Sequence, residues 1–321
     1  MIRFFRISKF HAFYLVNGDV TMSFPRITDE LSNIPLHIEK APADQKRYVQ
    51  ALKKNQREVF NAEVEFYKKI LELQIEHQNK VNKILDVRAA IINGEKDIKD
   101  EDCIEEAISN LSIEDQEKIF QGSATNEKGI KGFWLHVLQG FAETSERIFE
   151  RDEPILEQLK DIKLNLFNNG ENDQGFILTF VFGENEFFEE KELVKTYKTS
   201  YHPEEGEEFW LYDGNHIVSV ESSKVTWKAG KNPLVGRQGK DSSLEEAQSF
   251  FEYFMVAINI NECADEEDKE TAFVDFELGQ LFRDEVIPRA TLIYTGEYVG
   301  DDNLDMYEDG EEEESDEDEE N

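Results

Sequence analysis

The feature that most constrains this chain is a stretch of about 50 residues, between Pro42 and Gly94, that contains neither glycine nor proline. Those two residues interrupt helices, and the apolar residues here recur mostly three, four or seven positions apart, as in an amphipathic helix. At 1.5 Å per residue, such a helix would be roughly 75 Å long. Its apolar positions are Val49, Leu52, Val59, Phe60, Val64, Tyr67, Ile70, Leu71, Ile75, Val81, Ile84, Leu85, Ile91 and Ile92.

A helix of this length extends beyond any domain that the rest of the chain could form, so its own subunit cannot cover the whole stripe. The stripe therefore predicts a second helix, supplied by a second copy of the chain or by an intramolecular bundle. Helices of globular proteins seldom exceed about 25 residues, which favours the second copy. The predicted dimerisation residues are Val59, Val64, Tyr67, Ile70, Leu71, Ile75, Val81, Ile84 and Leu85.

The pattern changes from helical to alternating in the middle of the chain. Alternation through 159–166, 176–182, 193–199 and 217–227 predicts strands, with a turn between Asn168 and Gly175. Short polar loops join the strands, so we expect an antiparallel meander. Helical patterns return over Phe133 to about Phe149, over Leu244–Ile260, and over Phe273–Tyr294, where the stripe ends at Pro288.

Helices and strands in separate blocks predict the α+β class: a long N-terminal dimerisation helix, an antiparallel β-sheet domain packed with helices, and a disordered acidic C-terminal tail. The parts are a flexible extension (1–40), the long helix (41–93), an accessory helical segment (94–128), the α+β domain (129–298) and the tail (299–321). The accessory segment is expected to hold helices over 100–110 and 112–121. The basic start of the extension, residues 1–21, resembles a targeting presequence loosely, and a start-site extension explains it better because no cleavage signature follows.

The charge of the chain indicates what it can bind. It has 71 acidic and 35 basic side chains, a net charge of −36. Residues 301–321 hold 14 acids and no base, and removing those charges from −36 leaves −22 for the rest. Such a field repels nucleic acid and anionic lipid and attracts basic partners, although the same charge could serve solubility alone.

No arrangement of residues in the sequence indicates catalysis, a cofactor or a metal. The histidines have no metal-ligand spacing, and Cys103 and Cys263 are too few for a disulfide scaffold or a cysteine zinc site. No phosphate-binding glycine loop or nucleophile elbow is present. We therefore expect a protein that is not an enzyme and that uses no cofactor.

Two charged segments are candidate interaction sites. The tail is dense enough to mimic a phosphate backbone toward basic proteins, and Ser315, flanked by acids, is a candidate phosphorylation site. A basic segment among glycines and a proline is expected to form a projecting loop. That loop could be read by a nuclear import receptor, or it could form salt bridges with neighbouring acids. Its residues are Lys224, Lys228, Lys231, Arg237 and Lys240.

Several motifs, in order along the chain, resemble the nucleosome assembly protein family. They begin with Lys128-Gly-Ile-Lys-Gly-Phe-Trp-Leu135 and the block from Phe176 to Phe188. The later motifs are Leu193-x-Lys195-x-Tyr197, Trp227-Lys228-x-Gly230-Lys231, Ser249-Phe250-Phe251, Asp275-Phe276-Glu277-x-Gly279, Ile287-Pro288-Arg289-Ala290 and Tyr294-Thr295-Gly296-Glu297. The resemblance covers about Lys40 to Glu297. Lys131 stands where the family often has proline, and the basic N-terminal extension replaces the acidic one of longer members.

The resemblance implies a homodimer paired through the long helix, an acidic surface for core histones, and ATP-independent nucleosome assembly. It also implies shuttling between nucleus and cytoplasm, with the basic loop as the import signal. The alternative is an acidic interaction scaffold or phosphatase-inhibitor-like protein without histone specificity. The expected histone-binding residues are Glu184, Glu186, Glu189, Glu190, Glu204, Glu205, Glu207, Glu208, Glu311, Glu312, Glu313, Glu314, Asp316, Glu317 and Asp318.

Overall fold

The structure is a computed structural model that describes residues 36–99, 102, 127–170, 173–201, 215–235, 248–263 and 265–298. Contacts divide the chain into two units, Met1–Phe60 and Asn61–Asn321. The first unit holds α1 (Leu36–Glu39), which lies within the predicted extension, and the start of α2 (Ala43–Ile92), which continues into the second. The prediction of one long N-terminal helix is confirmed, and the helix begins at Ala43 and ends at Ile92. None of the described helices combines the length and apolarity that a membrane span requires.

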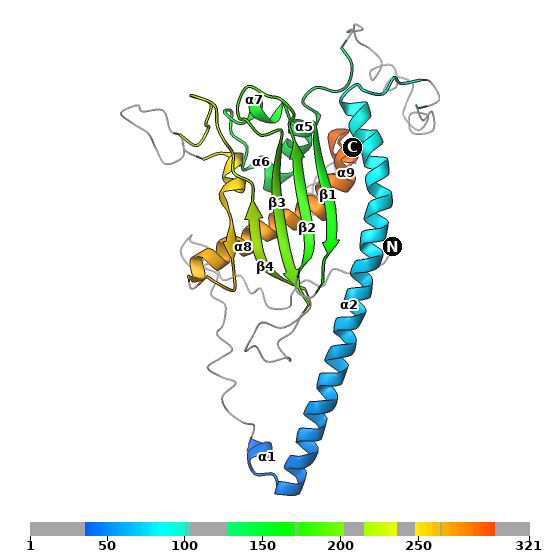
Figure 1. Cartoon of the computed structure of the whole chain (residues 1–321), viewed down its shortest axis with the longest axis vertical. Helices are drawn as coiled ribbons and strands as arrows, with labels where there is room; N and C mark the ends of the chain where they lie inside the picture. The colour runs from blue at the N-terminus through cyan, green and yellow to red at the C-terminus, as the bar shows by residue number, and fades with distance from the viewer. Residues whose placement is uncertain are drawn as a thin grey trace, which may run out of the picture. The chain divides into compact units, whose positions relative to one another are not determined.

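The second unit is built on a five-stranded antiparallel sheet (Figure 1). The strands follow one another in space as in sequence, so the predicted meander is confirmed. In β2, Phe176, Leu178 and Phe180 are buried on one face, while the alternate residues are partly exposed on the other. The strands are β1 (Asp161–Asn168), β2 (Gln174–Val181), β3 (Glu192–Ser200), β4 (His216–Ser222) and β5 (Ile258–Asn259).

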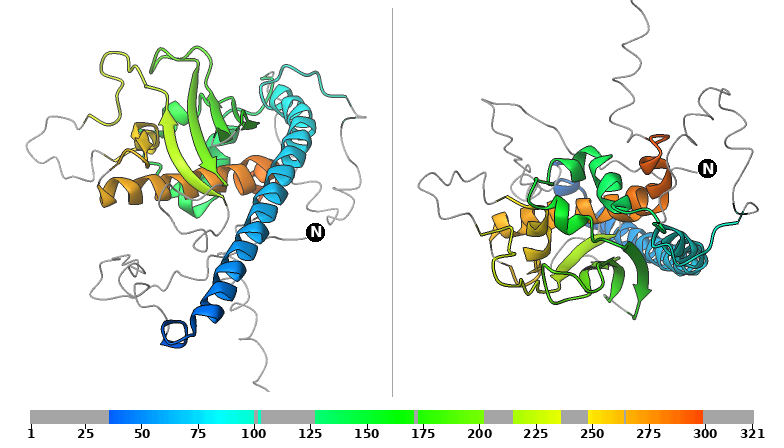
Figure 2. Two further views of the ribbon diagram at one scale, coloured as in Figure 1. Left: turned by 60° about the horizontal axis from the view of Figure 1, so that its bottom comes forward. Right: turned by 90° about the horizontal axis from the view of Figure 1, so that it is seen from above.

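The shorter helices of this unit pack on one face of the sheet, and the core lies between the two layers (Figure 2). Aromatic rings fill much of that core, with Phe180 touching rings of Phe250, Phe254 and Phe282. The helices are α5 (Phe133–Gln139), α6 (Ala142–Ser145), α7 (Glu153–Leu156), the 3₁₀ helix η5 (Phe250–Met255), α8 (Glu266–Leu281), the π-helical η6 (Phe282–Val286) and α9 (Ile287–Tyr294).

Three predicted elements differ in the structure. The helix predicted over 133–149 is divided at Gly140, where a Cβ would lie 2.8 Å from Ile293 of α9, so close packing requires glycine there. The prediction of a helix over 244–260 is wrong for the described residues, which begin at 248. The 3₁₀ helix η5 and the strand β5 occupy this region instead. The consecutive aromatic residues here are buried on several sides, whereas an amphipathic helix buries a single stripe. The strand predicted over 217–227 ends at Ser222, and Trp227 forms an isolated bridge with Phe188.

Pro288 does not end the last helical region, as its position in the stripe had indicated. The π-helical turn η6 precedes it, with the Ile287 N–H donating to the Phe282 carbonyl. Proline cannot donate the usual bond to the carbonyl four residues earlier. The Arg289 guanidinium donates to that carbonyl, of Asp284, at 2.7 Å. The wider turn and this side-chain bond let α9 continue through the proline.

The C-terminal part of α2 is attached to the sheet domain by polar contacts. Asn82 donates to the Leu164 carbonyl at 2.8 Å, Asn93 donates to the Lys160 carbonyl at 3.3 Å, and Arg88 donates to the Ile287 carbonyl at 2.6 Å. The Arg88 guanidinium also lies 5.2 Å from the centre of the Trp134 ring. These contacts place the end of α2 along β1, as Figure 1 shows.

Candidate functional site

Four of the predicted histone-binding residues lie in one loop between β2 and β3: Glu184, Glu186, Glu189 and Glu190. We call residues 183–191 the acidic loop, and Asn185 holds it in place. Its side-chain oxygen accepts bonds from the backbone N–H groups of Phe187 and Phe188, each at 2.9 Å. This Asx-type turn buries both phenylalanines and leaves Glu184, Glu186 and Glu189 exposed. Local chemistry therefore presents carboxylates on the outside of an apolar anchor.

The basic segment, residues 224–231, lies directly against the acidic loop. The Lys228 N–H donates to the Phe187 carbonyl at 2.8 Å, and the Glu189 N–H donates to the Thr226 carbonyl at 3.1 Å. The Phe188 and Trp227 rings meet edge to face at 5.5 Å. Two segments about 40 residues apart in the chain thus form one surface.

Opposite charges pair across this surface. Lys231 forms an ion pair with Glu186 at 2.7 Å and lies 5.2 Å from the centre of the Phe187 ring. The Lys228 ammonium donates to the Asn185 carbonyl at 2.5 Å, and within the loop Lys191 pairs with Glu184 at 2.9 Å. Of the two interpretations of the basic segment, the Lys231–Glu186 pair supports salt bridging with a neighbouring acid.

The pairing changes how readily these carboxylates take up protons. Hydrogen bonds from Lys191 and Lys231 lower the pKa of Glu184 and of Glu186, respectively. For Glu190, burial works to raise the pKa, but hydrogen bonds from Thr226 outweigh it, and the pKa is lowered. The three carboxylates therefore stay charged to a lower pH than ordinary glutamates do.

Replacing Lys231 with methionine should return the pKa of Glu186 toward the ordinary value of about 4.3. The pKa of Glu186 is lower in the folded chain than in the unfolded chain, so the ion pair stabilises the fold when the pH is above the ordinary pKa. This stabilisation is lost as the pH falls through the lowered pKa. A ¹³C NMR titration of the glutamate carboxyl groups measures the shift. Lys191→Met is the control and should move Glu184 instead; an unchanged Glu186 in Lys231→Met would refute the assignment.

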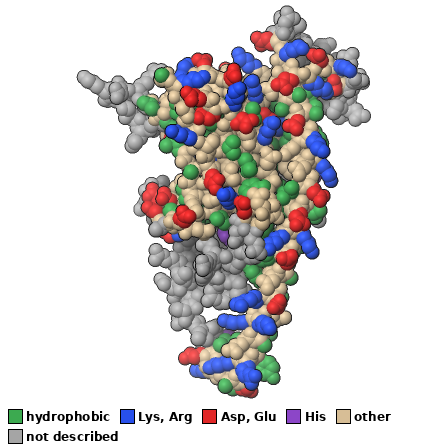
Figure 3. All heavy atoms as spheres, viewed as in Figure 1, with side chains coloured by type: hydrophobic (Ala, Val, Ile, Leu, Met, Phe, Trp, Pro, Cys, Tyr) green, Lys and Arg blue, Asp and Glu red, His purple; other side chains and the backbone are tan. Residues whose placement is uncertain are grey.

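A second acidic surface lies where α8 begins, and none of its residues is among the predicted histone-binding residues. Asp265 caps α8 by accepting a hydrogen bond from the Glu267 N–H at 3.1 Å. The acids in the first turn stabilise the helix further, because their negative charge interacts favourably with the helix dipole. These acids are consecutive in the sequence, but the predicted helix began only at Phe273, so they were not expected to lie on a helix. Figure 3 shows acidic side chains gathered at this end of the helix. Its exposed acids are Glu262, Asp265, Glu266, Glu267, Asp268 and Glu270.

The remaining predicted charged residues lie outside the described residues. This applies to Arg237 and Lys240 of the basic segment and to Ser315. It applies equally to the predicted histone-binding residues between β3 and β4 and in the tail: Glu204, Glu205, Glu207, Glu208, Glu311, Glu312, Glu313, Glu314, Asp316, Glu317 and Asp318.

The predicted dimerisation residues of α2 do not share one environment. Val64 and Leu71 are buried within the single chain, and Tyr67, Ile70, Ile75, Val81 and Leu85 are partly buried, whereas Val59 and Ile84 are exposed. Tyr67 stacks on Tyr201 of the sheet domain with ring centres 5.7 Å apart. A different, exposed stripe runs along the helix seven residues apart: Leu52, Val59, Phe66 and Leu73, with Val87 in the same register.

A buried polar network joins two of the motifs that carry the family resemblance. Lys195 of β3 pairs with Asp275 of α8 at 2.8 Å, with their side chains 0% and 4% exposed. The Tyr197 hydroxyl donates to the other Asp275 oxygen at 2.8 Å and lies 2.6 Å from the Tyr253 hydroxyl. At Gly279 a Cβ would lie 2.5 Å from the Tyr197 ring, so this glycine makes room for the network. These residues hold the sheet to α8 and η5.

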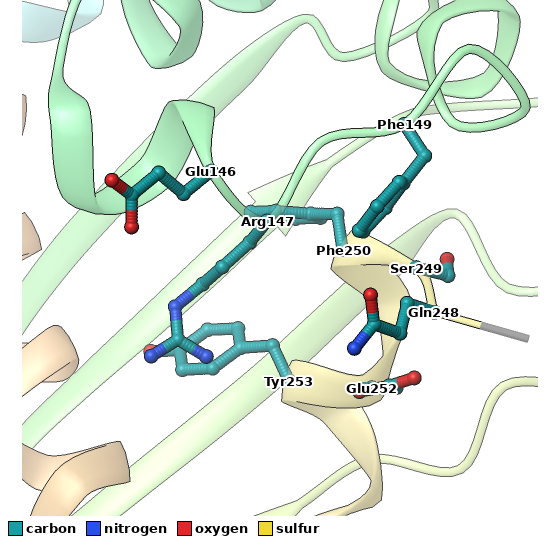
Figure 4. Close-up of a pocket in the computed structure, with 8 residues that line it drawn as sticks. All are labelled: Glu146, Arg147, Phe149, Gln248, Ser249, Phe250, Glu252 and Tyr253. Atoms are coloured by element: carbon teal, nitrogen blue, oxygen red, sulfur yellow. The ribbon is translucent and has the colours of Figure 1, made fainter. Parts of the chain in front are cut away.

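A small cavity of about 150 Å³ opens between the end of α6 and η5 (Figure 4). The Arg147 guanidinium lies beside the Tyr253 ring, whereas Glu146 points away from it. The lining contains both signs of charge, and its Ser249 hydroxyl donates to the buried Asp152 carboxylate at 2.5 Å. No group of three or more His, Cys, Asp or Glu in the described part of the chain is arranged to hold a metal.

Comparisons with known proteins agree on one family. The model of the nucleosome assembly protein family matches residues 47–297. Human nucleosome assembly protein 1-like 4 is 32% identical, over 92% of this chain and 86% of its own length. Nucleosome assembly protein 1-like 1-A of Xenopus laevis is also 32% identical, over 90% and 79%. Among solved structures, nucleosome assembly protein 1 from Plasmodium knowlesi has a similar fold, with a TM-score of 0.52, 23% identity, and coverage of 80% of this chain and 99% of the other.

Proposed function

Because the chain belongs to the nucleosome assembly protein family, we propose that it is a histone chaperone, which binds core histones through acidic surfaces and promotes nucleosome assembly without ATP. The observation that carries the proposal is the exposed carboxylates gathered at two places on the domain, the acidic loop and the start of α8. These surfaces belong to a chain of net charge −36. Clustered carboxylates attract the lysine and arginine side chains of a basic partner.

The proposed mechanism is charge screening by a shaped surface. Histone lysines and arginines would bind the carboxylates in place of DNA phosphates, so that histones are kept from unproductive contacts. DNA, with a denser line of negative charge, would take the histones over as a nucleosome forms. The acidic tail would add non-specific attraction that weakens as salt rises.

The chain is proposed to act as a homodimer paired through α2. The exposed apolar residues seven apart repeat with the period of a two-stranded coiled coil. This exposed stripe, rather than the buried Val64 and Leu71, would face the partner helix. Residues left uncovered within one chain are the ones that gain from pairing.

We propose further that the protein shuttles between nucleus and cytoplasm, with the basic segment read by an import receptor. In the structure Lys228 and Lys231 are engaged by the acidic loop. The Lys231–Glu186 ion pair is exposed, and exposed ion pairs contribute little to stability, so an acidic receptor could displace the loop.

The test is a titration of the whole chain, and of a version ending at Gly300, with histone dimers and tetramers near physiological salt. Lysozyme serves as an unrelated basic competitor. We expect saturable binding that survives removal of the tail and resists lysozyme. Binding that disappears with the tail, or that lysozyme abolishes, would favour the acidic scaffold without histone specificity.

A matched pair of variants locates the surface. Glu184→Gln/Glu186→Gln/Glu189→Gln removes three charges from the acidic loop, and Glu143→Gln/Glu150→Gln/Glu157→Gln removes three exposed charges from α6, α7 and their flanks. We expect the first set to weaken histone binding about tenfold, which corresponds to about 1.4 kcal/mol, and the second to weaken it much less. Equal effects would mean that only net charge matters.

A further inference from the structure

The outer face of α8 combines exposed apolar side chains with acids. Phe273 is 44% exposed and Val274 is 38% exposed, although both lie in the middle of a helix whose other face is buried in the core. At 100° per residue, these two share an arc of about 120° with Glu266, Glu267, Glu270 and Glu277. The opposite side carries the buried Ala272, Asp275, Phe276 and Gly279.

Most of the acids on this face are available to a partner. The exception is Glu266, which is paired with Lys269 one turn later at 3.2 Å. Within the described part of the chain, Glu267, Glu270 and Glu277 form no ion pair. The face is thus an apolar pair bordered by carboxylates, not a solvated polar surface.

We propose that the outer face of α8 is a docking surface for a basic amphipathic helix, whose apolar side chain covers Phe273 and Val274 while its lysines or arginines meet the surrounding glutamates. Charge complementarity favours this occupant: an acidic or neutral helix would bury Phe273 but would leave the glutamates unpaired or repelled. A purely basic disordered segment would pair with the glutamates but leave the apolar pair in water.

This inference rests on the proposed function, because helices of the bound histones would be the partners. The inference adds that apolar contacts, as well as charge, would contribute to histone binding on the outer face of α8. Charge alone gives binding that falls steeply as salt rises, whereas an apolar anchor keeps part of the affinity. Interface energy is commonly concentrated in a few such anchors within a polar border.

The experiment uses the full chain and a designed helical peptide with lysines on one face and leucines on the other, together with a scrambled peptide of the same composition. Fluorescence anisotropy measures their affinities at low and high salt, and the affinity for histone dimers is measured beside them. We expect the amphipathic peptide to bind at least tenfold more tightly than the scrambled one. Phe273→Ala/Val274→Ala should remove most of that difference and weaken histone binding about fivefold or more.

The control variant is Leu292→Ala on α9, where leucine is similarly exposed, at 42%. It should leave both affinities unchanged, and circular dichroism verifies that each variant is folded. Equal binding of the two peptides, or equal losses in both variants, would overturn the docking surface. A change of mass on sedimentation in Phe273→Ala/Val274→Ala would also overturn it, by showing that a second copy covers the face. If histones fail to bind but the peptide preference stands, the proposed function fails and the surface does not.

Discussion

Replacing Asp275 with alanine is expected to lower the free energy of unfolding by about 3–5 kcal/mol, because it leaves a buried charge without its partner. Lys195 uses its three N–H donors on Asp275, on the Tyr253 carbonyl and on the Val256 carbonyl, at 2.8, 2.7 and 3.3 Å. Without Asp275 the ammonium remains buried, and the Tyr197 hydroxyl loses an acceptor. Chemical denaturation followed by circular dichroism, at one protein concentration, measures the loss.

The loss of unfolding free energy in Asp275→Ala should become smaller as the pH is raised from neutral toward about 10. Burial lowers the pKa of Lys195, and the charge of Asp275 opposes that shift; removing Asp275 therefore lowers the pKa further. The unfolded chain then binds more protons than the folded one, so stability rises with pH until the unfolded lysine also titrates. A pH-independent loss would contradict this account.

Two variants isolate the buried pair from general effects of substitution. Glu270→Ala removes an exposed carboxylate from the same helix and should change stability by less than about 0.5 kcal/mol. Lys195→Met/Asp275→Leu replaces both charges with apolar groups and should recover much of the loss, since apolar pairs often replace buried ion pairs without cost. If Asp275→Ala alone is as stable as Glu270→Ala, the network does not hold the sheet to α8.

Replacing Leu73 with glutamate is expected to weaken dimerisation by at least about a hundredfold. Leu73 is 65% exposed within one chain, and Phe66 in the same stripe is 55% exposed. Burying one such side chain contributes about 1.5–3 kcal/mol, and a symmetric dimer loses the contact twice. Analytical ultracentrifugation over a range of concentrations gives the dissociation constant.

The matched control for this prediction is Asn79→Glu, which adds the same charge at an exposed position of α2 on the side away from the stripe. It should leave the dimer intact. A chain that is monomeric before any substitution, or a Leu73→Glu variant that dimerises normally, would show that the stripe has another occupant. Val64→Ala, by contrast, should lower stability without separating the dimer, because Val64 is buried within its own chain.

The elements that the sequence predicted well are those whose signal is local. The length of α2 follows from the absence of glycine and proline, and the four long strands follow from alternation that the pleated backbone imposes. The prediction for the region of η5 was wrong because its aromatic residues fit a helical and an irregular pattern equally well. These residues are Phe250, Phe251, Tyr253 and Phe254. The bond from Arg289 to the Asp284 carbonyl could not be read from the position of Pro288.

For the candidate sites, the sequence predicted which charged and apolar residues matter, but not how they come together on the surface. The acidic loop and the basic segment were each found, but their pairing through Lys231 and Glu186 depends on β2, β3 and the chain after β4 meeting in space. The apolar residues of α2 were found as one stripe, but two faces separate in the structure, one buried and one exposed.

The sequence by itself thus determined the long helix, the antiparallel meander, the acidic character and, through ordered motifs, the family. Each depends on residues close together in the chain, or on residue types alone. Only the tertiary structure decided which side of α2 remains exposed, which carboxylates are paired with lysines, and that Lys195, Tyr197 and Asp275 form one buried network. Those outcomes depend on which surfaces meet when the sheet, α2 and α8 pack, and residues such as Lys195 and Asp275 lie 80 positions apart.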